Sequence, residues 1–275
     1  MKRGDIVARK SYNKDIIFVV DKIIKNSKGN ATAILSGLVI RIKVDAPIDD
    51  LVLVSKEEKE REINRLDKTI KNRVNNVKKI KNYKKISNRE YKRNNVYIGK
   101  ILHLDGDRRY SEKSMKYYRE LGLNAVVRNI AENQQPYVVR RLLERYKPDI
   151  LIVTGHDSMI KNGSDYNNIY NYRNSRHFIN TVKEARKWGS NSDKLVIFAG
   201  ACQSYFEAIM LAGADFASSP GRILIDFIDP LIVAEKVATT ENYKYVTEKQ
   251  IIDEIKEGRE GIGGVGVKGK KRIIM

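Results

Sequence analysis

The chain contains a single cysteine, Cys202, and only three histidines, and one of each closes a short apolar run. Cys202 ends the run 195–202 (LVIFAGAC), and His156 ends the run 150–156 (ILIVTGH). Apolar runs of this length between polar turns are typical of central strands in a parallel sheet. Ligands of open α/β sheets bind at the carboxyl ends of the strands, and neighbouring strands lie about 5 Å apart. We therefore expect the thiol and the imidazole to meet at one edge of a sheet.

A thiol beside an imidazole is the pair that a cysteine protease requires, since the imidazole assists thiolate formation and backbone amides stabilise the oxyanion. We expect Cys202 to be the nucleophile and His156 its partner. The small residues Gly200 and Ala201 would let a substrate backbone approach closely. The amide of Cys202 is expected at the start of the next helix, where it would donate to the oxyanion and favour the thiolate. The alternative is that Cys202 fills space in the core, as free cysteines often do.

The other histidines and the cysteine count limit the chemistry further. His103 lies in or at the end of an earlier apolar run and could reach the same edge, whereas His177 falls within a predicted helix. We prefer His156 because it lies beyond its strand, beside Gly155. One cysteine cannot form an internal disulfide and does not suit a thiolate metal cluster, so we expect neither a metal nor a cofactor.

Length and charge set broader limits. The 275 residues suffice for one large domain or two, and the formal net charge is +19. Such a charge predicts attraction to polyanions or acidic proteins, and nucleic-acid binding on this basis needs a recognisable module. No apolar stretch is long enough to span a bilayer, and residues 1–5 lack the apolar core of a secretory signal. We expect a cytoplasmic protein without a membrane partner; the sequence does not indicate its oligomeric state.

The pattern along the chain divides it into three predicted regions. Residues 1–54 contain short β-branched runs between turn-forming clusters and predict a small SH3-like β-barrel. Residues 55–95 predict a basic amphipathic helix that links this barrel to the rest. Residues 96–275 alternate strand and helix patterns and predict an α/β domain with a doubly wound, mainly parallel sheet.

Individual elements follow from the same patterns. In the first region the strands are expected at 5–9, 16–24, 31–35 and 39–44. In the third region we expect strands at 96–104, 125–128, 150–156, 195–202 and 223–225, helices at 114–121, 136–145, 176–188 and 205–211, and a glycine-rich loop at 258–266.

The thiol and imidazole pattern resembles the caspase, gingipain and legumain group of cysteine peptidases. In that group an apolar strand precedes the histidine, and a later apolar strand precedes a small residue and the cysteine. The separation of His156 and Cys202 fits the spacing of about 50 residues in the caspase signature. The resemblance implies a caspase-like fold. The group usually has glycine after the histidine, where this chain has Asp157, whose amide is the positional match for the second oxyanion donor.

Over essentially its whole length, the chain resembles the sporulation-specific YabG protease family. The segments that carry this resemblance are 2–5 (KRGD), 102–107 (LHLDGD), 154–157 (TGHD), 199–204 (AGACQS) and 217–220 (ASSP). The resemblance implies a cysteine endopeptidase made in the mother cell of spore-forming bacteria. Its implied partners are spore coat and related proteins, cleaved after basic residues, chiefly Arg, and nucleic acid is not expected as the main partner.

A preference for Arg requires a carboxylate in the substrate pocket that receives this side chain, the S1 pocket. In the caspase-like fold, residues after the first strand line this pocket, which indicates Asp105 and Asp107. Asp226 and Asp229, beyond a later strand, are the second choice. An Arg-directed protease would also find many sites in its own Lys/Arg-rich segment 78–93, which predicts self-cleavage there.

Two other functions remain open from the residues alone. Asp105 and Asp107 after a strand resemble the paired aspartates of haloacid-dehalogenase-type phosphatases. The threonine expected shortly after the second aspartate is missing, however, and Arg108 follows instead. Alternatively, the barrel, the basic helix and the net charge could form a non-enzymatic scaffold or a nucleic-acid-binding protein, with Cys202 as core filler.

Overall fold

The computed structural model describes residues 1–25, 31–80, 96–160, 165–189 and 194–273. Its centre is a six-stranded sheet in the order β13-β11-β10-β9-β7-β8. All neighbours in this sheet are parallel except β13, which runs antiparallel to β11. The strands are β7 (Ile101–Asp105), β8 (Ala125–Asn129), β9 (Ile150–Thr154), β10 (Val196–Ala199), β11 (Phe216–Ser218) and β13 (Ile262–Gly264). The predicted α/β class with a mainly parallel sheet is confirmed.

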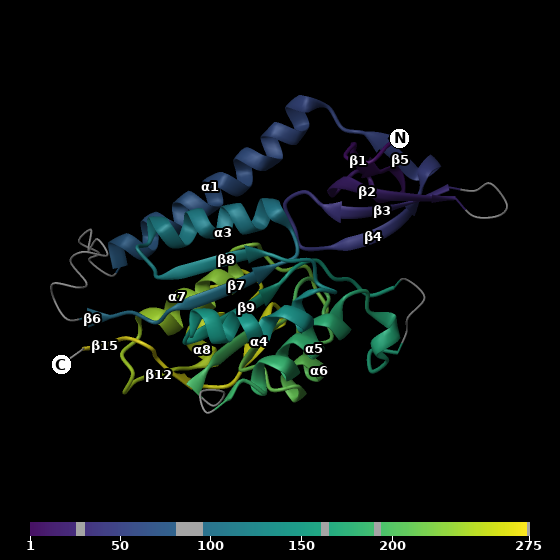
Figure 1. Ribbon diagram of the computed structural model, residues 1–275. Helices are drawn as coiled ribbons and strands as arrows, with labels where there is room; N and C mark the ends of the chain where they lie inside the picture. The colour runs from purple at the N-terminus through teal and green to yellow at the C-terminus, as the bar shows by residue number, and fades with distance from the viewer. Residues whose placement is uncertain (26–30, 81–95, 161–164, 190–193, 274–275) are drawn as a thin grey trace.

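Helices cover both faces of this sheet (Figure 1). One face carries α3 (Arg108–Glu120), α7 (Asp229–Thr239) and α8 (Glu248–Ile252). The other carries α4 (Gln135–Tyr146), α5 (Ser175–Arg186) and α6 (Phe206–Leu211). Near the C-terminus, the short strands β6 (Val96–Tyr97), β12 (Tyr245–Val246), β14 (Val267–Lys268) and β15 (Arg272–Ile273) form two small antiparallel pairs.

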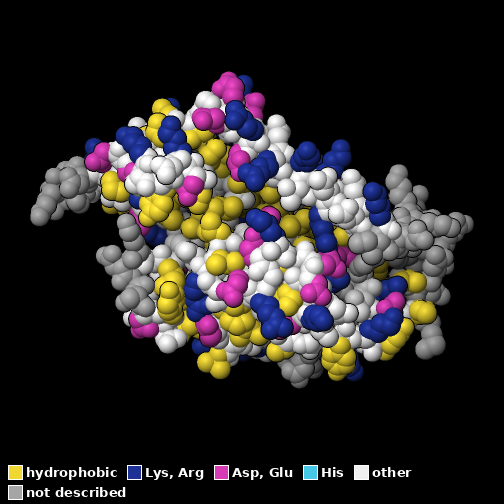
Figure 2. Space-filling view, turned by 180° about the vertical axis from the view of Figure 1, so that it is seen from behind, with side chains coloured by type: hydrophobic (Ala, Val, Ile, Leu, Met, Phe, Trp, Pro, Cys, Tyr) yellow, Lys and Arg dark blue, Asp and Glu magenta, His cyan; other side chains and the backbone are white. Residues whose placement is uncertain are grey.

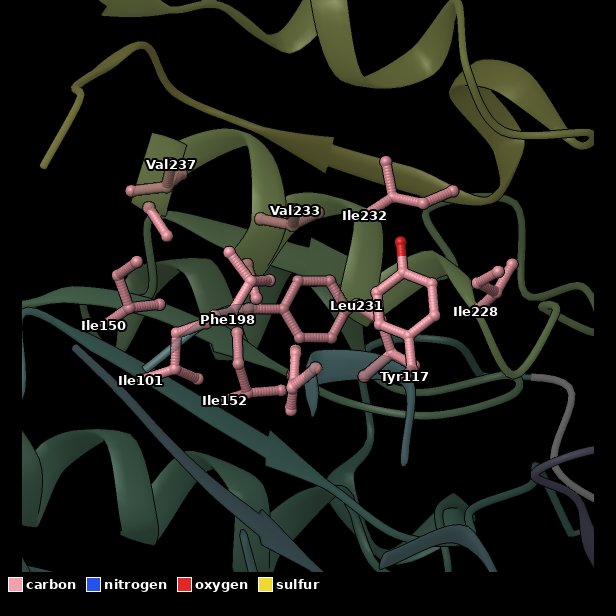
Figure 3. Close-up of a cluster of buried hydrophobic side chains, with 14 of the residues drawn as sticks. Ile101, Tyr117, Ile150, Ile152, Phe198, Ile228, Leu231, Ile232, Val233 and Val237 are labelled. Atoms are coloured by element: carbon pink, nitrogen blue, oxygen red, sulfur yellow. The ribbon is translucent and has the colours of Figure 1, made fainter. Parts of the chain in front are cut away.

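The uninterrupted apolar runs form strands because both of their faces are buried. Side chains of alternate strand residues, such as Ile101, Ile152 and Phe198, point toward Leu231 and Val237 of α7 (Figure 3). The residues between them pack against the helices of the opposite face. Burying a side chain of this size contributes about 1.5–3 kcal/mol relative to exposure, so this sheet is the rigid base for the residues at its edge.

Two predictions for the sheet are wrong. Residues 223–225 were expected to be a strand, but they follow a turn in which Ser219 and Arg222 have positive φ, and Phe216–Ser218 is the sheet strand instead. The glycine-rich segment 258–266 was expected to be a loop, but it contains β13, which pairs with β11. Gly264 lies so close to the Phe216 ring that a β-carbon there would clash with it, which explains a glycine in a strand.

The first region forms an antiparallel sheet of five strands in the order β4-β3-β2-β1-β5, here called the N-terminal sheet. Its strands are β1 (Ile6–Arg9), β2 (Ile17–Lys25), β3 (Ala31–Gly37), β4 (Lys43–Pro47) and β5 (Leu51–Leu53). The prediction of a strand at 39–44 is largely wrong, because the strand begins only at Lys43 and residues 38–42 form a loop. An SH3-like barrel and the three domain boundaries stay predictions.

Helix α1 (Lys56–Ile80) leads from the N-terminal sheet along α3 (Figure 1). Leu66, Val74 and Val77 on its apolar face are buried against the α/β part. Residues 81–95, which include most of the predicted self-cleavage segment 78–93, lie outside the described residues.

The surface carries its charge in a dispersed form. On the face shown in Figure 2, Lys and Arg side chains spread over the upper and lower parts of the molecule, with Asp and Glu among them. Among the described residues on this face, there is no single basic patch of the kind that a nucleic-acid-binding site requires. Among the described residues, no helix has the length and apolar character needed to cross a membrane.

Candidate active site

The predicted residues gather at the carboxyl edge of the six-stranded sheet. Asp105 ends β7 and Asp107 follows it, His156 follows β9, and Cys202 follows β10. The chain order of the strands reverses between β7 and β9, and ligands of open α/β sheets bind at such a switch point. The fold therefore brings the four side chains to the place where a site is expected.

A loop of the N-terminal sheet enters this edge. Arg41, in the loop between β3 and β4, is fully buried, and its Nη1 lies 2.6 Å from Asp105 Oδ2. The guanidinium lies over the rings of Tyr110 and Phe227, 4.6 and 5.2 Å from their centroids. These two rings are stacked on each other, and a carboxylate beside such an aromatic pair matches the charge and the flat shape of a guanidinium.

Behind Asp105, a chain of hydrogen bonds runs into the core. Thr154 Oγ1 donates to Asp105 at 2.9 Å and lies 2.7 Å from Nε2 of His103, whose Nδ1 lies 3.1 Å from the Tyr118 hydroxyl. Burial lowers the pKa of His103 to about 3, so this ring is neutral. A neutral ring that donates to Thr154 accepts from Tyr118, and all protons in the chain then point toward Asp105. His103 thus belongs to the support of the carboxylate.

His156 lies between a carboxylate and the loop Gly37–Ile42 that carries Arg41, called the inserted loop from here on. Its Nε2 is 2.9 Å from Asp107 Oδ2, and its Nδ1 is 3.2 Å from the carbonyl oxygen of Ile42. Asp107 also accepts hydrogen bonds from the amide and side chain of Arg109 at the start of α3. Although burial opposes it, these bonds from His156 and Arg109 hold the pKa of Asp107 well below its usual value. A charged Asp107 fixes the ring with Nδ1 toward the loop.

Glu132 supports the backbone at His156. Its Oε1 accepts the amide of His156 at 2.7 Å. The same carboxyl packs so closely against Gly155 and Gly106 that a β-carbon at either position would clash with it. The two glycines that follow β7 and β9 therefore let one carboxyl group reach both strand ends.

Cys202 lies in a tight turn after β10. Gly200 has φ of 120° and lies against Ser218, so no other residue fits there without strain. The hydroxyl of Ser204 accepts the amide of Ala201 at 2.9 Å and holds the turn together. The expected position of Cys202 at a helix start is wrong, because α6 begins only at Phe206.

The thiol of Cys202 is fully buried and faces the inserted loop. Burial raises the pKa of the Cys202 thiol to about 12, against the opposing effect of backbone hydrogen bonds from Ile225 and Arg41. Among the residues that the structure describes, no hydrogen bond joins this thiol to His156. The imidazole lies 3.2 Å from the carbonyl oxygen of Ile42, and the thiol lies in the same buried apolar cluster as Ile42, so the inserted loop packs against both groups.

Asp157 binds the same peptide through its backbone. Its amide donates to the carbonyl oxygen of Arg41 at 3.2 Å, and its own carbonyl accepts the amide of Lys43 at 3.1 Å. Its buried carboxyl group accepts hydrogen bonds from the hydroxyls of Ser175 and Ser204, at 2.5 and 2.9 Å. Burial nevertheless raises the pKa of Asp157 to about 6. This carboxyl group ties the loops after β9 and β10 together.

Among the described residues, Asp226 and Asp229, the second-choice acidic residues, form no ion pair with Arg41, although the charge of Arg41 acts on Asp229. Asp229 Oδ2 accepts the amide of Asp226 at 3.0 Å at the start of α7, and burial raises the pKa of both carboxyl groups. His177 lies in α5.

The sequence interpretation missed several contributors. Arg41, Glu132, Tyr110 and Thr154 were not singled out. Arg41 did leave a signal, since it is the one charged residue within the apolar stretch 38–42 (LVIRI). The other three have ordinary surroundings in sequence and become visible only when the strands are adjacent.

The α/β fold brings a thiol, an imidazole and acidic side chains together at its switch point. This arrangement is typical of an enzyme with its active site at the edge of the sheet. The family model described as YabG peptidase U57 matches residues 2–275. The sporulation-specific protease YabG of Bacillus subtilis (strain 168) is 36% identical over 286 residues, which cover 99% of this chain and 97% of that protein. The chain belongs to the YabG peptidase family, so the predicted family is confirmed and the protein is a protease.

Proposed function

We propose that this protein is a cysteine endopeptidase in which Cys202 is the nucleophile and His156 its catalytic partner. The observation that carries the proposal is an extended segment at the sheet edge that holds Cys202 and His156: the Arg41 carbonyl accepts the amide of Asp157, and the Ile42 carbonyl faces His156, as a bound substrate would. The membership in a peptidase family supports it. The phosphatase alternative has no matching observation, because Asp105 and Asp107 are engaged by Arg41 and His156. The burial of Cys202 is what the scaffold alternative expects, and the membership in a peptidase family is the reason to prefer the endopeptidase.

The proposed reaction has two steps. The sulfur of Cys202 attacks the scissile carbonyl while its proton passes to Nδ1 of His156, and the collapse of the oxyanion breaks the C–N bond as His156 protonates the leaving amine. A water molecule then attacks the thioester and gives its proton to His156, which restores the thiol. Asp107 keeps the imidazole oriented through Nε2, as the third member of a catalytic triad does.

Backbone amides would stabilise the oxyanion. The amide of Asp157 already donates to the carbonyl oxygen of Arg41, which is the position that a scissile carbonyl would take. The amide of Cys202 is the proposed second donor.

We assign Asp105 as the specificity determinant for Arg. It receives the guanidinium of Arg41 at 2.6 Å, and the stacked rings of Tyr110 and Phe227 lie beside that group. Asp107, the other candidate, pairs with His156 and is a positioning residue. A pocket of this kind favours Arg over Lys, because the delocalised guanidinium contacts the aromatic pair while it binds the carboxylate, and a compact, strongly hydrated ammonium does this less well.

The similarity to a sporulation-specific protease extends the proposal to its setting. The protein would act in the mother cell of a spore-forming bacterium, in the cytoplasm and at the spore coat, on coat and related proteins. The N-terminal region and the basic helix α1 would hold acidic substrates, and self-cleavage in segment 78–93 would follow from the preference for Arg.

The test is cleavage of an Arg-containing protein by the wild type and by Cys202→Ala, with the new termini identified by mass spectrometry. We expect the wild type to produce fragments that end in Arg and Cys202→Ala to produce none. Arg9→Ala, which changes an arginine on β1, is the control for a general effect of substitution. Equal cleavage by the wild type and Cys202→Ala would refute the proposal.

A further inference from the structure

The inserted loop, Gly37–Ile42, contacts each part of the proposed site. The Arg41 side chain binds Asp105, the Arg41 carbonyl accepts the amide of Asp157, and the Ile42 carbonyl faces His156. Ile42 also forms a parallel bridge with Asp157. An extended peptide that adds backbone hydrogen bonds to a site and places one side chain in a pocket binds as a substrate does.

The N-terminal sheet holds the inserted loop at both of its ends. The amide of Gly37 donates to the carbonyl of Ile42 at 2.9 Å, and Ser36 pairs with Lys43 where β3 and β4 begin to diverge. The amide of Leu38 donates to the carbonyl of Ile17 in β2, also at 2.9 Å. Because both sides of the Arg41–Ile42 bond are anchored in one sheet, opening that bond would not release either end from the site.

The same loop closes the site to other molecules. Cys202 and Arg41 both have 0% exposure, and the thiol lies in one apolar cluster with Ile42 and Ile225. His156 is also buried, and the contacts of Arg41 and Ile42 with Asp105, Asp157 and His156 take up the described positions that a substrate peptide would need.

We propose that the inserted loop is an internal inhibitor of the protease, with Arg41 in the place of a substrate arginine, and that another protein is cleaved only after this loop has left the site. The inference rests on the proposed function for the assignment of the S1 pocket. In the closed state the apparent affinity for an outside substrate is reduced by the fraction of molecules that are open. Weakening the Arg41 contact increases that fraction.

Two measurements on the full-length protein test the inhibitor. The first is the rate at which iodoacetamide alkylates the only cysteine, followed by intact mass. The second is the KM for a short peptide with one Arg. For Arg41→Ala we expect alkylation at least about tenfold faster and a KM at least about tenfold lower than for the wild type. Arg41→Lys keeps the charge and should fall between the two.

Arg9→Ala is the matched control, because Arg9 is a partly buried arginine of the N-terminal sheet that pairs with Asp50. It should alkylate and cleave as the wild type does. Thermal unfolding of each variant shows whether it is folded, and Arg41→Lys keeps the test valid if Arg41→Ala is not.

The outcomes separate the two proposals. Cleavage that depends on Cys202, with alkylation and KM unchanged in folded Arg41→Ala or Arg41→Lys, would overturn the inhibitor and leave the proposed function standing. Faster alkylation in Arg41→Ala without Arg-directed cleavage by any variant would support a closed loop but refute the proposed function.

Discussion

Two histidines on neighbouring strands of the same sheet have opposite surroundings. His103 lies within β7, and its ring nitrogens meet the hydroxyls of Thr154 and Tyr118 in the core. His156 lies two residues beyond the end of β9, and its ring reaches from Asp107 to the inserted loop. A side chain inside a central strand is fixed by packing, whereas one just beyond the strand end can face a ligand.

Each histidine is linked to one of two carboxylates at the carboxyl end of β7, where Asp105 is the last strand residue and Asp107 follows it. The chain from His103 through Thr154 ends at Asp105, which binds the guanidinium of Arg41. His156 pairs directly with Asp107. The two aspartates, two positions apart, therefore have different contacts: Asp105 holds a guanidinium and Asp107 holds an imidazole.

The largest expected effect separates the two histidines. His156→Gln should lower kcat about 10³-fold or more, because it removes the group that transfers the proton. His103→Gln, which can still hydrogen-bond to hydroxyls, should retain most of the kcat. Steady-state kinetics on an Arg peptide measure both values of kcat. Comparable losses of kcat in the two folded variants would show that the two histidines do not have different roles.

Asp107→Asn comes next. The amide keeps a hydrogen-bond acceptor for the start of α3 but no longer holds the imidazole by charge. We expect kcat to fall about 10²- to 10³-fold with little change in KM. A loss confined to KM would show that Asp107 binds substrate rather than positioning His156.

Asp105→Asn should act on selectivity. Without the carboxylate, the ratio of kcat/KM for an Arg peptide to that for its Gln counterpart should fall about 10- to 10²-fold. Measuring both peptides with the wild type and Asp105→Asn gives this ratio, and Asp107→Asn is the matched control with an unchanged ratio. An unchanged ratio in Asp105→Asn would show that residues other than Asp105 form the S1 pocket.

The smallest effect concerns stability against pH. The folded-state pKa of His103, about 3, lies below its ordinary value of 6.5, so stability is full above pH 6.5 and is lost as the pH falls. Between pH 7.5 and pH 5 this group should cost about 2 kcal/mol of unfolding free energy. Urea unfolding of the wild type and His103→Gln at both pH values tests this, since the variant should lack this part of the loss. An identical loss of unfolding free energy in both proteins would show that the pKa of the His103 ring is not lowered by burial.

The sequence was sufficient for the central strands β7 to β10 and for the positions at their carboxyl ends, but not for β11 and β13. Buried apolar runs identify strands, and the polar residues after them, such as Asp105 and His156, must meet where parallel strands end. It was insufficient where tertiary contacts override local pattern. Residues 39–42 have strand-forming side chains, yet Arg41 pairs with the buried Asp105 of the α/β part, and these residues form a loop. Glu132 acts on Gly155 and Gly106, which come together only in the folded sheet.

The proposal that Cys202 is the nucleophile of an Arg-directed site has a direct test in covalent labelling. A short peptide with a C-terminal arginyl chloromethyl ketone would react with the sulfur of Cys202 and release chloride, and the glutamyl reagent is its matched control. We expect the arginyl reagent to add one label per chain at Cys202 and to abolish cleavage in proportion. Full labelling of Cys202 with unchanged cleavage, or equal rates for the two reagents, would contradict the account.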